Sequence, residues 1–203
     1  MPNVSDVKSK FFGAVDALDA DGISVAASIG SATTLTLGGA LTSGGSYTSG
    51  DNIGQLVTIL SAGDDSGITF TVVGTDAVGD AQTEVVTGAN AGTATSSGYF
   101  NTVTSITTSA ASAGDVSAGV TGTGTGTVFA GRTRIRGLQG LSGTAAGNLL
   151  FKNTSVTGTT LLTVPTQAAA ELIEPYIPDN GVLFDAGAYV NFGSAVATVT
   201  VFY

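Results

Sequence analysis

The feature that most constrains the fold is a period of two that runs through the chain from about residue 29. Val, Ile, Leu and Phe alternate with Thr in short runs, and Gly, Asp, Asn and Ser separate these runs about every eight to twelve residues. Because successive side chains of a strand point to opposite faces, this spacing predicts an antiparallel β-sandwich or barrel. The clearest runs are 33–41, 54–60, 67–73, 83–88, 98–109 and 114–120.

The stretch GITFTVVGTDAVGDAQTEVVTG (67–88) predicts a β-hairpin with a long loop. Ile68, Phe70 and Val72 fall on one face of a first strand, and TEVVTG supplies the returning strand. The GTDAVGD between them has the residues of a turn, since Gly tolerates positive φ and Asp hydrogen-bonds to nearby backbone.

Two interpretations of the first 28 residues stay open. A short amphipathic helix is favoured by apolar residues that recur at spacings of three and four. These residues are Val4, Val7, Phe11, Val15 and Leu18. The alternative is an extended arm that packs Phe11 and Phe12 against a neighbouring chain or a second domain, because these rings would otherwise be exposed beside lysines.

The low-complexity tract TGTGTGT (121–127) has nothing to bury and is expected to be a linker at the boundary between two domains. More β runs follow it. The predicted organisation is therefore all-β: an N-terminal arm or helix (1–28), a β-sandwich-like domain (29–120), the Gly/Thr linker (121–127) and a second, smaller β domain (128–203).

The composition excludes several classes of function. There is no His and no Cys, so Ser–His–Asp triads, Cys–His pairs and zinc sites of the usual kind are ruled out. Six basic residues against fifteen acidic ones give a net charge of −9, which is the wrong sign for a nucleic-acid or anionic-membrane partner. No apolar run approaches the roughly 20 residues that span a bilayer.

The carboxylates are expected to be turn residues and not a catalytic or metal site. A glycosidase-like pair or a calcium loop could draw on Asp64, Asp65, Asp76, Asp80 and Glu84. Most of them are flanked by glycines, and the regular calcium-loop spacing is missing. We therefore predict that the protein is not an enzyme and has no cofactor and no essential metal.

Three arginines form the one charged pattern with a possible role in binding. In a strand, Arg132, Arg134 and Arg136 share one face at a spacing of about 7 Å. One interpretation is a solvated or internally paired edge. The other is an interface with carboxylates of another subunit, which guanidinium groups bind in a bidentate manner.

Two segments resemble virion structural proteins of tailed bacteriophages. The first is 61–107, with ITFTVVGTD, TEVVTG and YFNTVTSI, and the second begins at GNLLFKNTS (147–155) and runs to residue 203. The resemblance implies a non-enzymatic β protein assembled on a virion, such as a capsid decoration (cement) protein. It does not distinguish head from tail, and it carries over no catalytic residues.

The first expectation is thus a head decoration protein on the outer surface of the capsid, made in the host cytoplasm. It would be a homo-oligomer, expected to be a trimer, that bridges neighbouring subunits of the major capsid protein. The expected interface residues are Phe11, Phe12, Arg132, Arg134 and Arg136. A tail component (a tube, nozzle or fibre subunit) is the second expectation. A carbohydrate-binding or adhesin module ranks below both, because the chain has five Tyr and no Trp.

Overall fold

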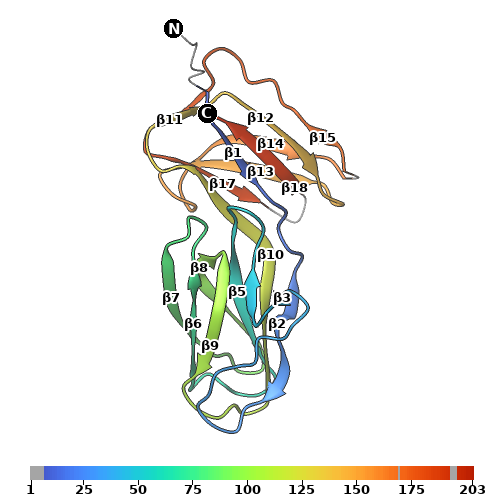
Figure 1. The fold of residues 1–203 in the computed structure, drawn as a ribbon, viewed down its shortest axis with the longest axis vertical. Coiled ribbons are helices and arrows are strands. Elements are labelled where there is room, and N and C mark those ends of the chain that lie inside the picture. Colours follow the sequence, from blue (N-terminus) through green and yellow to red (C-terminus); the bar gives the residue numbers. More distant parts are fainter. Residues whose placement is uncertain (1–6, 169, 193–195) are drawn as a thin grey trace. The chain divides into compact units, whose positions relative to one another are not determined.

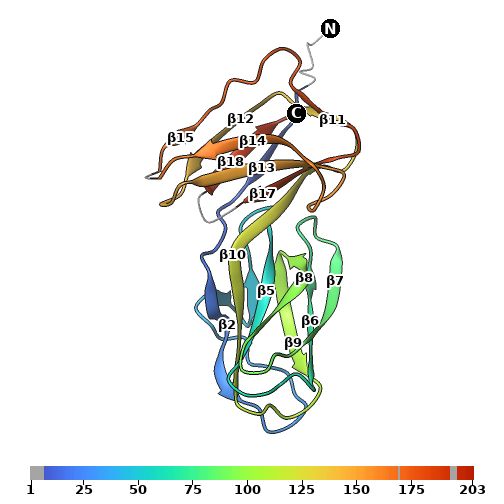
Figure 2. The same ribbon diagram turned by 180° about the vertical axis from the view of Figure 1, so that it is seen from behind.

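The computed structural model describes residues 7–168, 170–192 and 196–203. Within these residues the regular structure consists of antiparallel strands, with no helix and no closed barrel. Figures 1 and 2 show the strands from opposite sides. The prediction of an all-β, sandwich-like fold is confirmed.

The chain divides into two compact units that are discontinuous in sequence. One unit, here called the inserted unit, consists of 16–50 and 54–124. The other, here called the terminal unit, consists of 1–15, 51–53 and 125–203.

The inserted unit is formed by two antiparallel sheets around one core. One sheet has the order β3-β4-β9-β6-β7, and in the other β10 neighbours β5, β5 neighbours β8, and β2 pairs with β10. Buried side chains from both sheets make the core, including Tyr47, Ile59, Phe70, Phe100 and Ile106. The strands are β2 (Asp19–Ser28), β3 (Thr42–Ser43), β4 (Ser46–Thr48), β5 (Gly54–Ser61), β6 (Thr69–Thr75), β7 (Ala81–Thr87), β8 (Thr93–Phe100), β9 (Thr102–Thr108) and the first part of β10 (Asp115–Phe129).

The terminal unit has a core of its own, in which Phe12, Phe151, Phe184 and Phe192 are buried. One sheet has the order β1-β18-β12-β15, a second contains β14-β13-β17-β10, and β11 pairs with β16. The strands are β1 (Ser9–Phe12), β11 (Thr133–Ile135), β12 (Gly137–Ser142), β13 (Gly147–Asn153), β14 (Thr160–Thr166), β15 (Leu172–Ile173), β16 (Val182–Phe184), β17 (Ala188–Phe192) and β18 (Val196–Phe202).

The predicted hairpin is confirmed. Strands β6 and β7 pair from Thr69 with Thr87 to Thr75 with Ala81. The loop between them is closed by Asp76, whose Oδ1 accepts hydrogen bonds from the Val78 N–H at 2.9 Å and the Asp80 N–H at 3.0 Å. Gly79 supplies the positive φ, 92°.

The helix suggested for the N-terminal segment is wrong for the residues that the structure describes, and Val4 lies outside them. Ser9–Phe12 form β1, which pairs antiparallel with β18, Phe12 lying opposite Val199. The segment 1–28 is also not one arm, because it is divided at Val15 between the two units. The extended conformation is favoured because β1 gains backbone hydrogen bonds from β18 and buries Phe12 completely.

The Gly/Thr tract 121–127 contains the predicted boundary between two units, but it is not a linker. The whole tract lies inside β10, and the boundary between the units falls within it, between Gly124 and Thr125. The glycines allow close approach of other groups: a Cβ on Gly126 would overlap the Phe12 ring and lie 2.9 Å from the Asn52 carbonyl oxygen. A tract of small residues is here a tightly packed strand.

Candidate functional site

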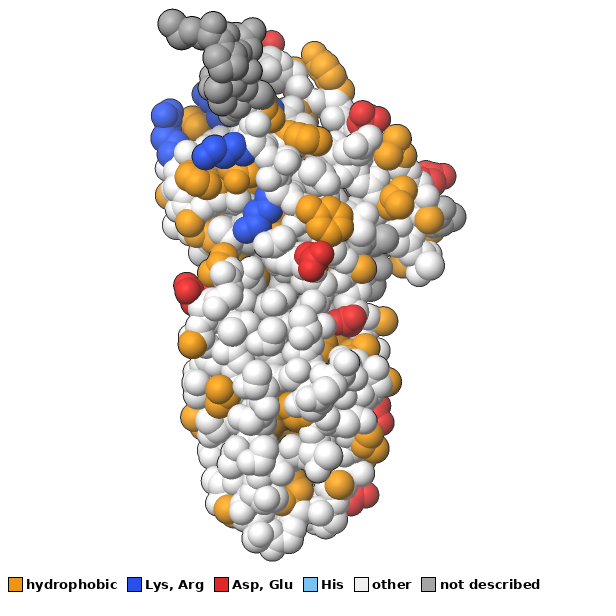
Figure 3. Space-filling model, in the orientation of Figure 1, with side chains coloured by type: hydrophobic (Ala, Val, Ile, Leu, Met, Phe, Trp, Pro, Cys, Tyr) orange, Lys and Arg blue, Asp and Glu red, His pale blue; other side chains and the backbone are white. Residues whose placement is uncertain are grey.

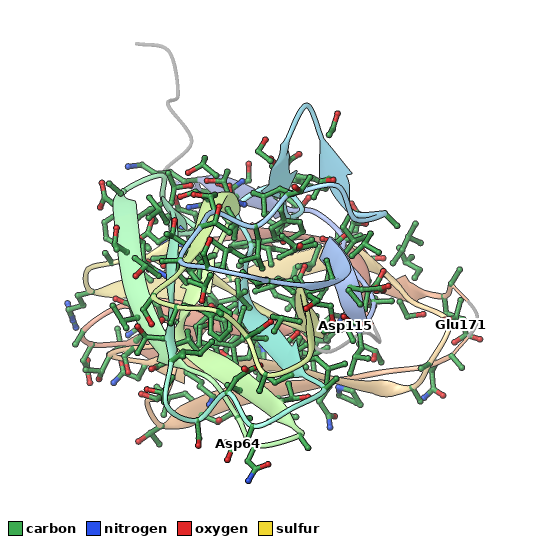
Figure 4. The ribbon with its side chains drawn as sticks, turned by 90° about the horizontal axis from the view of Figure 1, so that it is seen from below. Asp64, Asp115 and Glu171 are labelled. Carbon is green, nitrogen blue, oxygen red and sulfur yellow. The ribbon has the colours of Figure 1, made fainter. Side chains whose placement is uncertain are left out.

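Among the residues that the structure describes, no three Asp or Glu side chains come together to form a group that could hold a metal ion. Asp65 is buried, and its Oδ1 accepts a hydrogen bond of 2.7 Å from the Ala113 N–H. Asp64 accepts hydrogen bonds from the hydroxyl and the N–H of Ser66, which hold the pKa of this exposed carboxyl below its usual value. Figure 4 shows Asp64 and Asp115 apart from one another.

Glu84 has a structural position that the sequence did not indicate. Its Oε1 accepts hydrogen bonds from the N–H and the hydroxyl of Ser97, at 2.7 and 2.9 Å, and its Oε2 accepts one from the Gly98 N–H at 2.8 Å. Glu84 is in β7 and its partners are in β8, each at the end of its sheet. The side chain therefore links the two sheets of the inserted unit, and both of its oxygens accept hydrogen bonds.

The basic side chains gather at one place on the terminal unit. An open hollow of about 320 Å³, here called the basic groove, is lined by Lys8, Phe129, Arg132, Thr133, Arg134, Arg136, Leu183 and Tyr203. Four of the six basic residues of the chain line this groove. Figure 3 shows the blue side chains lying over the terminal unit on the face in view.

Short strands and the paired ends of the chain position the groove. Arg134 lies in β11 opposite Leu183 of β16. Arg132 and Arg136 flank this three-residue strand. Lys8 is fixed beside Tyr203 by two backbone hydrogen bonds of 2.8 Å, one in each direction.

The arginines are weakly neutralised. The Arg132 Nε lies 3.9 Å from Asp185 Oδ1, and the two side chains are 70% and 72% exposed. An ion pair this exposed to solvent contributes little to stability. Arg134 donates a hydrogen bond of 3.2 Å from Nη1 to the Gly181 carbonyl oxygen, and Arg136 is exposed. The groove therefore keeps a positive potential that favours carboxylates.

The groove also has an apolar side. The rings of Phe129 and Tyr203 lie 5.8 Å apart between centroids, and Phe129 is half-exposed. A ligand with acidic groups next to an aliphatic group would match both the guanidinium groups and these rings.

The predicted interface residues separate into two groups. Arg132, Arg134 and Arg136 do line one surface, although Arg134 alone of the three lies within a strand. Phe12 is completely buried in the core of its own chain, 5.5 Å from the ring of Phe192, while Phe11 is 45% exposed. Lys8 was missed because its place depends on the pairing of β1 with β18, which no local pattern reveals.

A second hollow, of about 400 Å³, lies in the inserted unit. It is lined by β2 residues from Ser24 to Ser28 and by the segment that contains Thr33 to Thr36. No charged side chain lines it, and its polar side chains are the hydroxyl groups of Ser and Thr.

No protein-family model, no curated protein and no solved structure matches this chain. No helix capable of crossing a membrane is present in the ranges that the structure describes.

Proposed function

We propose that this chain is a non-enzymatic structural protein of a tailed-bacteriophage virion, and that it acts as a head decoration protein that bridges neighbouring subunits of the capsid. The observation that carries the proposal is the basic groove, with its four cationic side chains beside the half-exposed ring of Phe129 and the half-buried ring of Tyr203. Such a surface fits a contact with protein carboxylates, which guanidinium groups bind in a bidentate manner.

Three further observations support the proposal. The sequence segments 61–107 and 147–203 resemble virion structural proteins. Acidic residues that the sequence offered as candidates for a catalytic pair or a calcium loop instead form hydrogen bonds in turns and between sheets, as Asp76 and Glu84 illustrate. The terminal unit also exposes large apolar side chains, which are typical of surfaces covered in an assembly. These side chains are Leu141, Leu161, Leu172 and Tyr176.

The test is to count and locate the chain in purified particles of the phage that encodes it. Quantitative mass spectrometry of intact particles and of tail-less heads should find this chain in both, at a copy number comparable to that of the major capsid protein. Cryo-electron microscopy of the heads should show its two β units on the outer surface. A few copies that leave with the tails would favour a tail component, and absence from the particles would refute the proposal.

A further inference from the structure

The net charge of −9 is unevenly divided between the two units. All six basic residues, four of them in the basic groove, belong to the terminal unit, which also has six acidic residues and is formally neutral. The inserted unit has nine acidic residues and no basic one, so it carries the whole formal charge of −9. Each copy therefore has one unit that is purely anionic and another with a concentrated cationic surface.

At least four of the nine carboxylates of the inserted unit are buried or hydrogen-bonded within it. Asp65 is buried, Asp64 binds Ser66, Glu84 binds Ser97 and Gly98, and Asp16 binds Tyr47. These groups gain less from an external cation than a solvent-exposed carboxylate does, because their hydrogen bonds within the unit would compete.

The β6–β7 turn, residues 76–80, offers a different arrangement. Asp80 is exposed, and Asp76 holds the turn in shape through its Oδ1. Between the two acidic residues Val78 is 53% exposed. The turn thus presents two acidic residues around an aliphatic side chain on a hydrogen-bonded, preorganised backbone, which lowers the entropy lost on binding.

We propose that the basic groove of one copy binds the β6–β7 turn of a second copy. The exposed Asp80 faces the arginines of the groove, Asp76 holds the turn that presents it, and Val78 packs against Phe129 and Tyr203. The two surfaces match in sign and in their apolar component. This inference does not depend on the virion proposal, since it concerns how copies of the chain contact one another.

The contact is heterologous, because it joins two different surfaces of identical chains. A pair joined by one such contact keeps a free groove on one copy and a free turn on the other. Such contacts close into rings, including the trimer expected from the sequence, or continue as open chains. Because the attraction is between exposed charges, association should be fast and should weaken as salt screens it.

The experiment measures self-association of the purified full-length chain by sedimentation velocity at about 0.05 M and about 0.5 M salt. The wild-type chain should associate at low salt and dissociate at high salt. Arg136→Glu in the groove and Asp80→Lys in the turn should each weaken association by about tenfold or more. Arg136 is preferred to Arg134 because Arg134 also holds the Gly181 carbonyl group within its own unit.

Two variants serve as matched controls with the same changes of charge. Lys152→Glu alters the terminal unit outside the groove, and Asp21→Lys alters the inserted unit outside the turn. Both should associate like the wild-type chain. Thermal melting of every variant should show that it is folded.

The decisive sample is a mixture of the Arg136→Glu and Asp80→Lys chains. The first has an intact turn and the second an intact groove, so the mixture should associate although neither chain associates alone. The proposal is overturned if the wild-type chain is monomeric at low salt, if Lys152→Glu is as disruptive as Arg136→Glu, or if the mixture stays monomeric. A monomeric chain present at capsid copy number would reject this contact and leave the virion proposal standing.

Discussion

At the scale of single residues, the buried polar network around Tyr47 shows how the inserted unit accommodates polar groups in its core. The Tyr47 hydroxyl lies 2.9 Å from both Asp16 Oδ2 and Gln55 Oε1. The Gln55 oxygen already accepts hydrogen bonds of 3.0 Å from the Ser49 hydroxyl and from the Asp16 N–H. Because a carbonyl oxygen has two lone pairs, the single Tyr47 proton is best placed to bind the Asp16 carboxylate.

This network predicts a pH dependence of stability. Burial, assisted by the Asp16 charge, raises the pKa of Tyr47 above its ordinary value of about 10. The folded protein then keeps the phenol proton at a pH where the unfolded chain loses it. The stabilisation is complete below about pH 10 and decreases as the pH rises above it.

The measurement is urea unfolding followed by circular dichroism between about pH 8 and pH 12. In the wild-type protein the free energy of unfolding should fall above about pH 10, by up to about 1.4 kcal/mol per pH unit for this one proton. In Tyr47→Phe the fall should be shallower. Tyr176→Phe, at a position 88% exposed, is the control. Equal slopes for wild type and Tyr47→Phe would contradict the prediction.

At the scale of elements, local signals were sufficient for part of the fold. The β6–β7 hairpin could be predicted because its alternation, its Asp76 turn and its Gly79 all lie within one short stretch. The pairing of β1 with β18 could not, because the partners lie near opposite ends of the described chain and neither segment specifies the other. For the same reason the shared surface of the arginines was predicted and the contribution of Lys8 was not.

The prediction of a linker at 121–127 was wrong for a different reason. Alternating Gly and Thr has the composition of a flexible linker, but composition does not reveal which groups approach the backbone in the folded chain. Around Gly126 the absence of a side chain is what admits Phe12 and the Asn52 carbonyl group. The same glycines that suggested flexibility are required by close packing.

We therefore predict that Gly126→Ala destabilises the protein by about 1–3 kcal/mol, because its Cβ would overlap the Phe12 ring and backbone cannot move away cheaply. Gly137→Ala in β12 is the matched control, since its nearest neighbour would be Phe202 Cδ2 at an ordinary 3.7 Å. It should change the free energy of unfolding by less than about 0.5 kcal/mol. Both variants should be measured by chemical denaturation. If the tract 121–127 were a linker, Gly126→Ala would have as small an effect on the free energy of unfolding as Gly137→Ala.

At the scale of the whole molecule, the terminal unit is built from three separate pieces of the chain. Its N-terminal piece contributes β1 to the sheet and Phe12 to the core, next to Phe192. A local change in β1 should therefore act on strands at the other end of the sequence.

Phe11 and Phe12 provide an internally controlled test of this point. Phe12→Ala should cost about 3–5 kcal/mol and accelerate amide hydrogen exchange in β1, β12 and β18. Exchange in β6 and β9 of the inserted unit should stay close to that of the wild-type protein. Phe11→Ala, one residue away and partly exposed, should cost about 1 kcal/mol or less. Similar effects of the two substitutions would show that β1 is not part of this core.

The pairing of β1 with β18 also means that β1 cannot form its sheet until the end of the described chain has been synthesised. A ribosome adds about 5–20 residues per second, so roughly 10–40 s pass between the completion of β1 and the start of β18. The inserted unit is complete at residue 124 and is free to fold during this interval, while β1 waits with its strand edge and its two phenylalanines uncovered. The nascent chain is therefore most vulnerable to misassembly at β1, and chains that terminate before β18 should carry a folded inserted unit and a β1 segment with an unpaired edge.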